Sequence, residues 1–487
     1  MMKEKFEPTW SSLKRHRHPE WLDDAKYGIY FHWGIYSVPA FGSEWYPNRM
    51  YTLFTPEFSH HVNKYGLPKD FGYKDFIPDF TAEHFDAGAW AALFKEAGAR
   101  FAGPVAEHHD GFSLWDSKIN KWNSVNMGPR RDIVKELATA IRDEGMKFIC
   151  TFHHAQNWYY YNHSTGLDTG QPEFEGLYGK PHAAVDGEGT SNNTMDRPDF
   201  EFNETWFAKL KEVIDGYEPD LIWFDFGLER IHDTYKRQLA AYYYNKGMEW
   251  GKEVEIIYKN FNMPPGVGLL DYERGRSDAL THHKWITDTS IGNRSWSYIE
   301  NEDYKAVKTL VHNFVDRISK NGYLLLNFGP KADGTIPPAV IERLKGMGAW
   351  IKLNSEGIFG STPWVLSGEG PTTLEGGGMF SENAEVAYTE RDIRFVTKDN
   401  ALFAFVMGWP LDGALNIKSL TLPPVYENRE ERPGKFYILE PADIASISML
   451  GHQGNLEWDL TARGLFIQLP ASPGPCKHAY GFKIQWT

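Results

Sequence analysis

The segment FAKLKEVIDGYEPDLIWFDFG, residues 207–227, contains a helix pattern followed directly by a strand pattern. Its apolar side chains first recur at the spacing of one helix face, at Phe207, Leu210, Val213 and Ile214. Gly216 is a helix stop signal. The run Asp220–Asp225 is apolar nearly throughout, as in parallel strands that are buried on both faces. The segment therefore predicts a helix that ends near Gly216 and a buried parallel strand after it.

The same alternation of helix and strand patterns extends from residue 25 to residue 355. The other candidate strands are Tyr27–Tyr36, Arg100–Ala106, Lys147–Phe152, Val254–Asn260 and Tyr323–Phe328. Further helix patterns are Trp90–Ala97, Ile133–Ile141, Val307–Ile318 and Pro338–Leu353. Strand–helix alternation of this length predicts a parallel sheet closed into a (β/α)8-like barrel. A doubly wound open sheet is the alternative, although the G-x-G-x-x-G motif that usually follows its first strand is missing.

Helical periodicity largely disappears after residue 355, and glycine-rich segments take its place. Short alternating runs follow at Ile393–Val396, Ala401–Val406 and Leu465–Leu469. Alternation with a period of two residues indicates strands, and a series of short strands separated by turns is typical of an all-β sandwich. We therefore expect two domains, a catalytic barrel at residues 1–355 and a C-terminal β-sandwich at residues 356–487.

The composition is that of an acidic globular protein and narrows the classes of partner. At 487 residues the chain is longer than a single hydrophobic core normally supports. A formal net charge of −14 disfavours attraction to phosphate backbones, so we expect no nucleic-acid partner. Aromatic residues make up 15% of the chain, which fits either a large aromatic core or rings that stack on sugars.

The N-terminal sequence MMKEKFEPTW lacks the apolar stretch of a signal peptide, and no apolar run approaches the length of a membrane span. We therefore expect no membrane partner and, for the chain as written, a cytoplasmic protein. A leader peptide ahead of residue 1 would instead make the protein periplasmic or secreted.

Polar residues at the carboxyl ends of the predicted strands are the candidates for chemistry, because the active sites of barrels lie there. Asp225 ends its strand beside Trp223 and Phe224, and Gly227 follows. One interpretation is an Asp that caps the next helix. The other is a nucleophile, because a carboxylate beside apolar rings can capture an oxocarbenium-like transition state. The aromatic neighbours favour the nucleophile.

A second strand ends in the run His108-His109-Asp110, which has three interpretations: metal ligands, groups that bind hydroxyls, or an ordinary turn. A barrel metal site usually takes further ligands from other strand ends, commonly an H-x-H on the first strand, but that strand has His32 alone. Neutral imidazoles can donate to and accept from sugar hydroxyls. Sugar binding is therefore favoured over a metal site.

Two further places carry similar groups. His153 and His154 follow another strand, and Glu44 and Trp45 lie in the loop after the first strand. Together, the strand ends present His, Trp and carboxylate groups with hardly any Lys or Arg. This combination suits a neutral polyhydroxy ligand better than a phosphorylated one.

Six segments carry a resemblance to a known family. They are YGIYFHWGIYSVPA (27–40), GSEWY (42–46), EHHDGFSLW (107–115), PDLIWFD (219–225), SWSY (295–298) and SKNGYLLLN (319–327). In this order they resemble glycoside hydrolase family 29, the α-L-fucosidases, across residues 20–365. The C-terminal sandwich resembles the second domain of that family more loosely.

The resemblance implies hydrolysis of terminal α-L-fucose with retention, through a covalent glycosyl-enzyme and without a metal or an organic cofactor. Asp225 falls on the family's nucleophile. The positions that fall on fucose-binding residues are His32, Glu44, Trp45, His108, His109 and Trp223. His153 or His154 stands where the family usually has a tyrosine, and Lys259 lies near the place of an arginine that often helps to bind fucose. Members of the family often associate, so a homo-oligomer fits the resemblance.

The general acid/base is identified less directly. Many members have a Trp-Glu pair ahead of the S-W-x-Y segment, but here the pair reads Trp285-Ile286. Retention requires a second carboxyl group that is protonated before the attack and deprotonated after it. The nearest suitable carboxyl group belongs to Glu273, after the strand-like run Val267–Tyr272. Glu273 is therefore the predicted acid/base.

Other interpretations stay open at this point. Glu273 also fits a surface ion pair with Arg274 or Arg276, and Glu44 and Asp288 are the next candidates for the acid. The missing Trp-Glu glutamate supports a degenerate fucose-binding protein that has lost catalysis. The His-His-Asp run supports a metal-dependent barrel hydrolase.

The sequence thus predicts an exo-acting, retaining α-L-fucosidase whose partner is a fucosylated glycan, either an oligosaccharide or a glycoconjugate. We expect Asp225 to attack the anomeric carbon while Glu273 protonates the leaving oxygen. Trp45 or Trp223 is expected to cover the methyl-bearing face of the sugar.

Overall fold

Eight strands, β1 to β8, form a closed barrel in chain order. Each strand pairs in parallel with the next, and β8 returns to pair with β1. Their bounds are β1 Tyr27–Phe31, β2 Phe101–Glu107, β3 Lys147–Phe152, β4 Leu221–Phe224, β5 Glu255–Tyr258, β6 Leu269–Asp271, β7 Trp285–Ser290 and β8 Gly322–Phe328. The predicted barrel is confirmed, and the doubly wound sheet is excluded.

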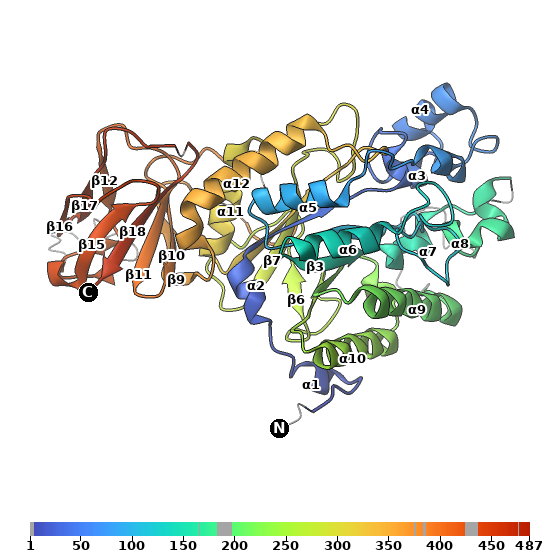
Figure 1. Ribbon diagram of the computed structural model, residues 1–487, viewed down its shortest axis with the longest axis horizontal. Coiled ribbons are helices and arrows are strands. Elements are labelled where there is room, and N and C mark those ends of the chain that lie inside the picture. Colours follow the sequence, from blue (N-terminus) through green and yellow to red (C-terminus); the bar gives the residue numbers. More distant parts are fainter. Residues whose placement is uncertain are drawn as a thin grey trace.

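The computed structural model describes residues 4–164, 166–182, 197–374, 376–382, 386–423, 437–475 and 477–487. The helices are α1 Trp10–Leu13, α2 Glu20–Ala25, α3 Tyr46–Arg49, α4 Pro56–Tyr65, α5 Ala87–Glu96, α6 Ile133–Asp143, α7 Asn157–Tyr160, α8 Glu175–Tyr178, α9 Phe200–Tyr217, α10 Asp233–Trp250, α11 Val307–Ser319 and α12 Pro338–Ile358. Helices α5, α6, α9 and α10 lie around the barrel, and α11 and α12 lie between the barrel and the C-terminal sheets (Figure 1).

Helix α6 illustrates how the sequence builds each strand–helix unit. The Asp132 side chain caps its first turn by accepting a hydrogen bond from the backbone N–H of Lys135. The residues buried on its inner face are Ile133, Val134, Leu137, Ala138 and Ile141. This face covers β2 and β3, which are buried almost throughout. Because α6 covers β2 and β3 from outside, the carboxyl ends of these strands remain free to form a site.

The barrel interior is a packed core. Its main side chains are Tyr30, Phe101, Val105, Ile149, Leu221, Trp223, Ile257, Leu269, Ile286, Tyr323 and Leu325. Each is less than one-tenth exposed. This filling closes the barrel below the rim, so ligands reach only the carboxyl ends of the strands.

The C-terminal part of the chain is a domain of mainly antiparallel sheets, drawn in orange and red in Figure 1. A five-stranded sheet has the order β15-β18-β11-β10-β9, a three-stranded sheet the order β12-β17-β16, and β13 pairs with β14. The bounds are β9 Thr362–Glu369, β10 Ile393–Lys398, β11 Ala401–Val406, β12 Ala414–Ile417, β13 Leu420–Thr421, β14 Tyr437–Ile438, β15 Ile444–Met449, β16 Trp458–Thr461, β17 Gly464–Gln468 and β18 Tyr480–Trp486. The predicted all-β C-terminal domain is confirmed.

Several predicted element bounds differ from the structure. Strand β7 was not predicted, because four of its six side chains are polar although every one is buried. Helix α9 ends at Tyr217, one residue beyond the predicted stop at Gly216. Helix α12 extends to Ile358 and spans the predicted domain boundary at residues 355 and 356, which stays a prediction.

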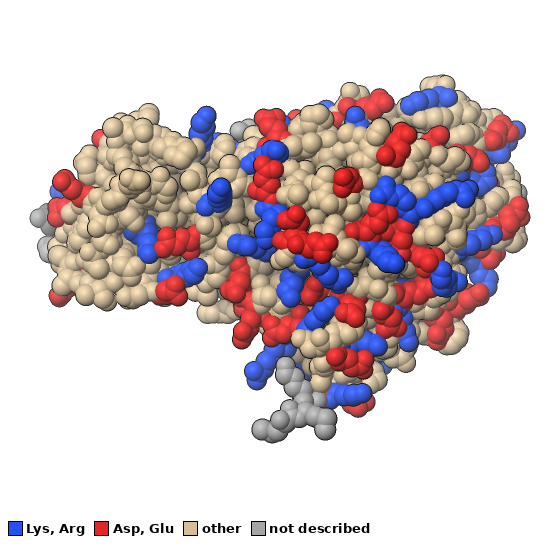
Figure 2. All heavy atoms as spheres, in the orientation of Figure 1, with Lys and Arg blue, Asp and Glu red and all other residues tan. Residues whose placement is uncertain are grey.

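The surface carries charges of both signs. On the face shown in Figure 2, Lys and Arg side chains are interspersed with Asp and Glu side chains, and the C-terminal sheets at the left are largely uncharged. Among the helices of the described ranges, none has the length and apolarity needed to cross a bilayer. The expectations about nucleic-acid and membrane partners stay predictions.

Candidate active site

The carboxyl ends of the barrel strands converge on one pocket. Its lining residues are Tyr30, His32, Glu44, Trp45, His108, His109, His153, Asp225, Phe226, Lys259, Glu273, Asp288 and Trp296. They come from the ends of β1 to β7 and from the loops that follow these strands. The pocket therefore contains every predicted site residue except His154 and Trp223.

Lys259 connects the two predicted catalytic carboxyl groups. Its Nζ lies 2.8 Å from Asp225 Oδ1 and 2.7 Å from Glu273 Oε2. The separation of these two oxygens therefore cannot exceed the sum of the two distances. Retaining glycosidases hold their carboxyl groups about 5–5.5 Å apart and inverting enzymes about 6.5–9.5 Å apart. This upper limit lies below the range of inverting enzymes and fits a retaining pair.

Strand register explains why these three residues meet. Asp225 and Lys259 are the first residues beyond β4 and β5, and Glu273 is the second residue beyond β6. Neighbouring parallel strands lie about 4.8 Å apart, so residues at their ends face one another across the rim. Glu273 is 8% exposed, and the Arg274 guanidinium lies 4.6 Å above the Trp296 ring. A surface ion pair between Glu273 and Arg274 is therefore excluded.

The two carboxyl groups differ in protonation. Burial acts to raise the pKa of Asp225, but the charge of Lys259 and the contacts from His153 and His109 outweigh it and hold this pKa well below its ordinary value. Burial raises the pKa of Glu273 to about 7; Lys259 opposes the rise, and Asp288 and Asp225 add to it. Asp225 is therefore ionised, while Glu273 keeps its proton below neutral pH.

A layer of polar groups lies under this pair. The Tyr30 hydroxyl donates to Asp288 Oδ2 at 2.7 Å, and Trp223 Nε1 donates to Asp271 Oδ2 at 2.9 Å. Burial and the neighbouring Asp288 raise the pKa of Asp271 well above its ordinary value. Trp223 is fully buried, and Lys259 Nζ lies 4.5 Å from the centre of its ring. Trp223 therefore supports the pocket from below, whereas the sequence predicted contact with the ligand.

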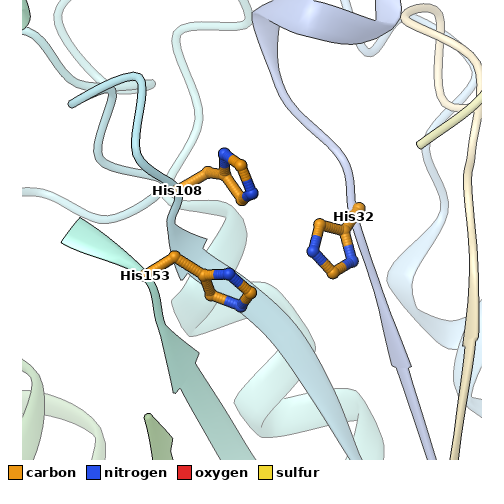
Figure 3. A group of neighbouring side chains, drawn as sticks. All are labelled: His32, His108 and His153. Atoms are coloured by element: carbon orange, nitrogen blue, oxygen red, sulfur yellow. The ribbon is translucent and has the colours of Figure 1, made fainter. Parts of the chain in front are cut away.

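Three imidazoles from three strand ends face a common space in Figure 3. His32, His108 and His153 follow β1, β2 and β3, and burial lowers the pKa of each. They are therefore neutral at neutral pH, so each ring has one donor and one acceptor nitrogen. His32 Nδ1 donates to Asn327 Oδ1 at 2.8 Å, which leaves its Nε2 as the acceptor. This set of groups matches the hydroxyls of a neutral sugar.

Both oxygens of Asp225 are fixed by neighbours. Oδ1 contacts Lys259, while Oδ2 lies 3.0 Å from His153 Nδ1 and 3.4 Å from His109 Nε2. The His109 ring is itself oriented, because its Nδ1 donates to the His153 carbonyl oxygen at 2.7 Å. The carboxylate is thus held in one orientation before any ligand binds, which is how preorganised sites stabilise charge.

Aromatic rings and a loop form the upper wall. The Trp45 and Phe226 rings are parallel within 4°, with centroids 6.1 Å apart, and the Trp296 ring lies 5.6 Å from His32. Glu44 Oε2 accepts from the backbone N–H of Trp296 at 3.0 Å. Glu44 therefore holds the loop that carries Trp296, in addition to lining the pocket.

The structure separates His154 from the pocket. Its ring lies 5.8 Å from Phe152 and 6.2 Å from Trp206 of α9, on the outside of the barrel. Side chains beyond a strand tend to continue its alternation, so His153 and His154 point to opposite faces. Of the two predicted alternatives, His153 is the one that lies in the pocket.

The predicted His-His-Asp run does not form one cluster. Asp110 lies behind the pocket, where its Oδ2 accepts from the Tyr73 hydroxyl at 2.8 Å. Two other groups bring possible ligand atoms within 4.8 Å of one another, and they are His32–His108–His153 and His109–His153–Asp225. Neutral imidazoles and a carboxylate are donors that zinc-type ions accept. Asp110 therefore does not join His108 and His109 as a metal ligand, as the metal interpretation of the run 108–110 requires. A chelation experiment tests the two other groups.

Three pocket residues had no predicted role. Tyr30 precedes His32 by two positions, so strand alternation signals that both face inward. Trp296 lies in the SWSY segment that carries part of the family resemblance. Phe226 has no signal beyond its position next to Asp225.

Comparisons with known proteins agree with this geometry. The family profile described as Alpha-L-fucosidase matches residues 1–356, and the one described as Alpha-L-fucosidase C-terminal domain matches residues 383–485. The tissue alpha-L-fucosidase of Homo sapiens is 30% identical over 499 residues, which cover 99% of this chain and 92% of the human protein.

Solved structures show the same relationship. The Thermotoga maritima alpha-fucosidase in complex with fucose has a TM-score of 0.75 at 30% identity, covering 99% of this chain and 100% of that chain. The same enzyme in complex with a mechanism-based inhibitor has a TM-score of 0.75 at 29% identity, with the same coverage. This chain belongs to the α-L-fucosidase family, glycoside hydrolase family 29.

Proposed function

We propose that the protein is a retaining exo-α-L-fucosidase in which Asp225 is the nucleophile and Glu273 is the acid/base. The observation that carries the assignment is the pair of contacts from Lys259 Nζ, at 2.8 Å to Asp225 and 2.7 Å to Glu273. This bridge limits the separation of the carboxyl groups to one that fits a retaining pair. The opposite shifts of their pKa values give each group the charge that its role requires.

The reaction has two steps. Asp225 attacks the anomeric carbon, the bond to the leaving oxygen breaks, and the proton of Glu273 moves to that oxygen. In the second step Glu273, now a carboxylate, takes a proton from water, and the resulting hydroxide displaces Asp225 from the anomeric carbon. L-Fucose leaves with its original configuration, and both carboxyl groups return to their starting states.

The pocket walls fit one terminal sugar. The neutral rings of His32, His108 and His153 can bond its hydroxyls. Trp45 and Phe226 offer an apolar surface to the methyl-bearing face, the role predicted for Trp45 or Trp223. Because lining residues come from β1 to β7 around the rim, the pocket is enclosed at its sides, which suits removal of a chain end.

Hydrolysis of p-nitrophenyl α-L-fucoside by the wild type, Asp225→Ala and Glu273→Ala tests the roles. Both variants should lose activity by about 100-fold or more, because each removes a group that acts in the transition state. Azide should rescue both variants with products of opposite configuration. Asp225→Ala should form the β-fucosyl azide directly, whereas Glu273→Ala should form the α-fucosyl azide from its glycosyl-enzyme.

Two further variants test whether Glu273, and no other carboxyl group of the pocket, is the acid/base. Glu44→Ala and Asp288→Ala remove the other candidate acids, and neither should give an α-fucosyl azide. If Glu273→Ala keeps nearly full activity while one of these variants shows azide rescue, the acid/base is the other residue and the proposal for Glu273 is wrong. A wild type that binds fucose but turns over no fucoside would instead identify a binding protein.

A chelator distinguishes the metal-dependent alternative. Prolonged dialysis against EDTA should leave the rate unchanged, because the proposed steps use only side chains of the chain. Loss of activity that zinc or another divalent ion restores would support a metal at the imidazoles and overturn the two-carboxylate mechanism.

A further inference from the structure

A segment from the C-terminal side of the chain lies directly on the backbone that carries Glu273. We call residues 376–382 the clamp segment and residues 273–277 the acid segment. The backbone N–H of Phe380 donates to the Glu273 carbonyl oxygen at 2.7 Å, and that of Gly378 donates to the Arg276 carbonyl oxygen at 2.8 Å. These contacts join residues more than a hundred positions apart in the sequence.

The same pairing continues at the C-terminal end of the clamp segment. The backbone N–H of Glu382 donates to the Arg274 carbonyl oxygen at 2.7 Å, and the backbone N–H of Arg276 donates to Ser381 Oγ at 3.1 Å. The acid segment needs such support because it lies beyond β6, a strand of only three residues. Arg274, the neighbour of Glu273, also has a φ of 42°, a conformation that a residue with a side chain rarely adopts without external support.

The Glu382 side chain anchors the clamp segment in the barrel. It is 4% exposed, and its carboxylate lies 3.2 Å from Lys305 Nζ and 3.6 Å from Arg317 Nη2. Asn313 Nδ2 donates to Glu382 Oε1 at 2.6 Å, and the Thr289 hydroxyl donates to Oε2. The two cations outweigh the effect of burial and lower the pKa of Glu382, so it is ionised.

Arg317 joins this anchor to the acid segment a second time. Its Nη2, which faces Glu382, also donates to the Gly275 carbonyl oxygen at 3.0 Å. From the same helix region, Lys320 Nζ donates to the Ser277 carbonyl oxygen at 3.0 Å. The acid segment is therefore held from α11 on one side and from the clamp segment on the other, and Glu382 contacts both supports.

We propose that Glu382 is a positioning residue for the acid/base: by anchoring the clamp segment and Arg317, it fixes the acid segment so that the Glu273 carboxyl group reaches the leaving oxygen. This inference rests on the proposed role of Glu273. The clamp segment lies between the two regions that match family profiles, residues 1–356 and 383–485, so neither profile includes it.

A leaving-group comparison tests the inference. Phenyl α-L-fucoside needs a proton on its leaving oxygen, whereas 2-chloro-4-nitrophenyl α-L-fucoside and α-L-fucosyl fluoride depend on one much less. Glu382→Gln should lower kcat/KM for the phenyl fucoside by about tenfold or more, since a misplaced acid loses part of the about 100-fold or greater gain from general acid catalysis. For the two activated substrates the change should stay within about threefold, because nucleophilic attack by Asp225 is retained.

Two other variants keep the test decisive. Asn313→Ala removes one donor to Glu382 and should give the same selective loss to a smaller extent, even if Glu382→Gln folds poorly. Glu255→Gln is the matched control, since Glu255 is 1% exposed and paired with His16 and His18 at the opposite end of the barrel. Glu255→Gln should change the rates on all substrates by the same factor.

The outcomes separate the inference from the proposed function. Equal losses on all substrates in Glu382→Gln and Asn313→Ala, or no loss in either, would overturn the positioning role if Glu273→Ala still shows the selective loss. If the loss of kcat/KM in Glu273→Ala does not depend on the leaving group, the assignment of the acid/base is wrong. The positioning role of Glu382 is then wrong as well.

Discussion

At the scale of single residues, Lys259 decides how the two carboxyl groups divide their roles. Its ammonium group contacts Asp225 and Glu273 and lies 3.6 Å from Asp288, with Asp271 close by. These charges raise the pKa of Lys259 well above its ordinary value, against the effect of burial. One ammonium cannot balance the negative charge of several buried carboxylates. The carboxyl group that has the weaker electrostatic stabilisation therefore keeps its proton. The arrangement yields an ionised nucleophile beside a protonated acid.

Replacement of Lys259 should move the pH dependence of the reaction. In the wild type, kcat/KM should fall as pH rises through about 7, where Glu273 loses its proton. Lys259→Met removes a charge that favours both carboxylates, so both pKa values should rise and both limbs of the profile should move to higher pH. At pH 6 the rate should fall by about 100-fold, because Asp225 loses its main electrostatic partner.

Lys259→Arg serves as the control for this prediction. It keeps the charge, so its profile should stay close to that of the wild type even if its rate falls. Profiles of kcat/KM between pH 4 and pH 9 provide the measurement. Unchanged limbs in Lys259→Met would show that the lysine does not control the protonation of the pair.

At the scale of elements, the close packing of β2 against β3 places His108, His109 and His153 at the rim. Gly103 makes this packing possible, because a Cβ at this position would lie 1.7 Å from the Ile149 carbonyl oxygen. A side chain there can be accommodated only if the two strands move apart. The histidines that follow these strands would then move with them.

Gly103→Ala should lower the free energy of unfolding by about 3 kcal/mol, because overpacking at a backbone contact cannot be relieved by a change of rotamer. Gly216→Ala in α9 is the control, since a Cβ there would meet nothing within 4 Å. It should raise the free energy of unfolding by about 0.5–1 kcal/mol through helix propensity. Urea unfolding of the wild type and both variants provides the measurement. A Gly103→Ala variant as stable as the wild type would refute the packing role of Gly103.

At the scale of the whole molecule, a buried ion-pair group joins the barrel to the C-terminal sheets. Asp316 of α11 lies 2.7 Å from Arg394 Nε of β10 and 2.9 Å from Lys320 Nζ. Burial acts to raise the pKa of Asp316, but these two cations outweigh it and lower the pKa to about 2. Because the folded pKa is below the unfolded one, Asp316 stabilises the fold above about pH 4 and loses this effect as pH falls toward 2.

Asp316→Asn should lower the free energy of unfolding by about 3–5 kcal/mol at pH 7, since it leaves two buried cations without a counter-ion. The shift in the pKa of Asp316 accounts for about 2 kcal/mol of this loss. The difference in the free energy of unfolding between wild type and variant should therefore be smaller by about 1 kcal/mol at pH 3. Glu356→Gln is the control, because the pair of Glu356 with Lys483 is about half exposed and should contribute at most about 1 kcal/mol. If the difference in unfolding free energy between wild type and Asp316→Asn is the same at pH 3 and pH 7, the ionisation of Asp316 does not stabilise the fold.

Much of the architecture could be predicted from the order of residues. Strands β3 and β11 were predicted at their exact bounds, because each is a compact apolar run between turn residues. Strand β7 was missed because Asp288 and its polar neighbours break the apolar pattern of a buried strand, although all of them are buried. The helix stop predicted at Gly216 lies one residue before the end of α9 at Tyr217.

The sequence by itself determined that a barrel forms and that His32, His108, Asp225 and their companions gather at one rim, because parallel strands bring their carboxyl ends together. Only the tertiary structure decided how these groups act on one another. The bridge of Lys259 between Asp225 and Glu273, and the support of Glu382 for the acid segment, join residues that are distant in the chain. Local periodicity fixes which face a side chain occupies, whereas such contacts depend on how loops beyond the strands pack, which no local pattern specifies.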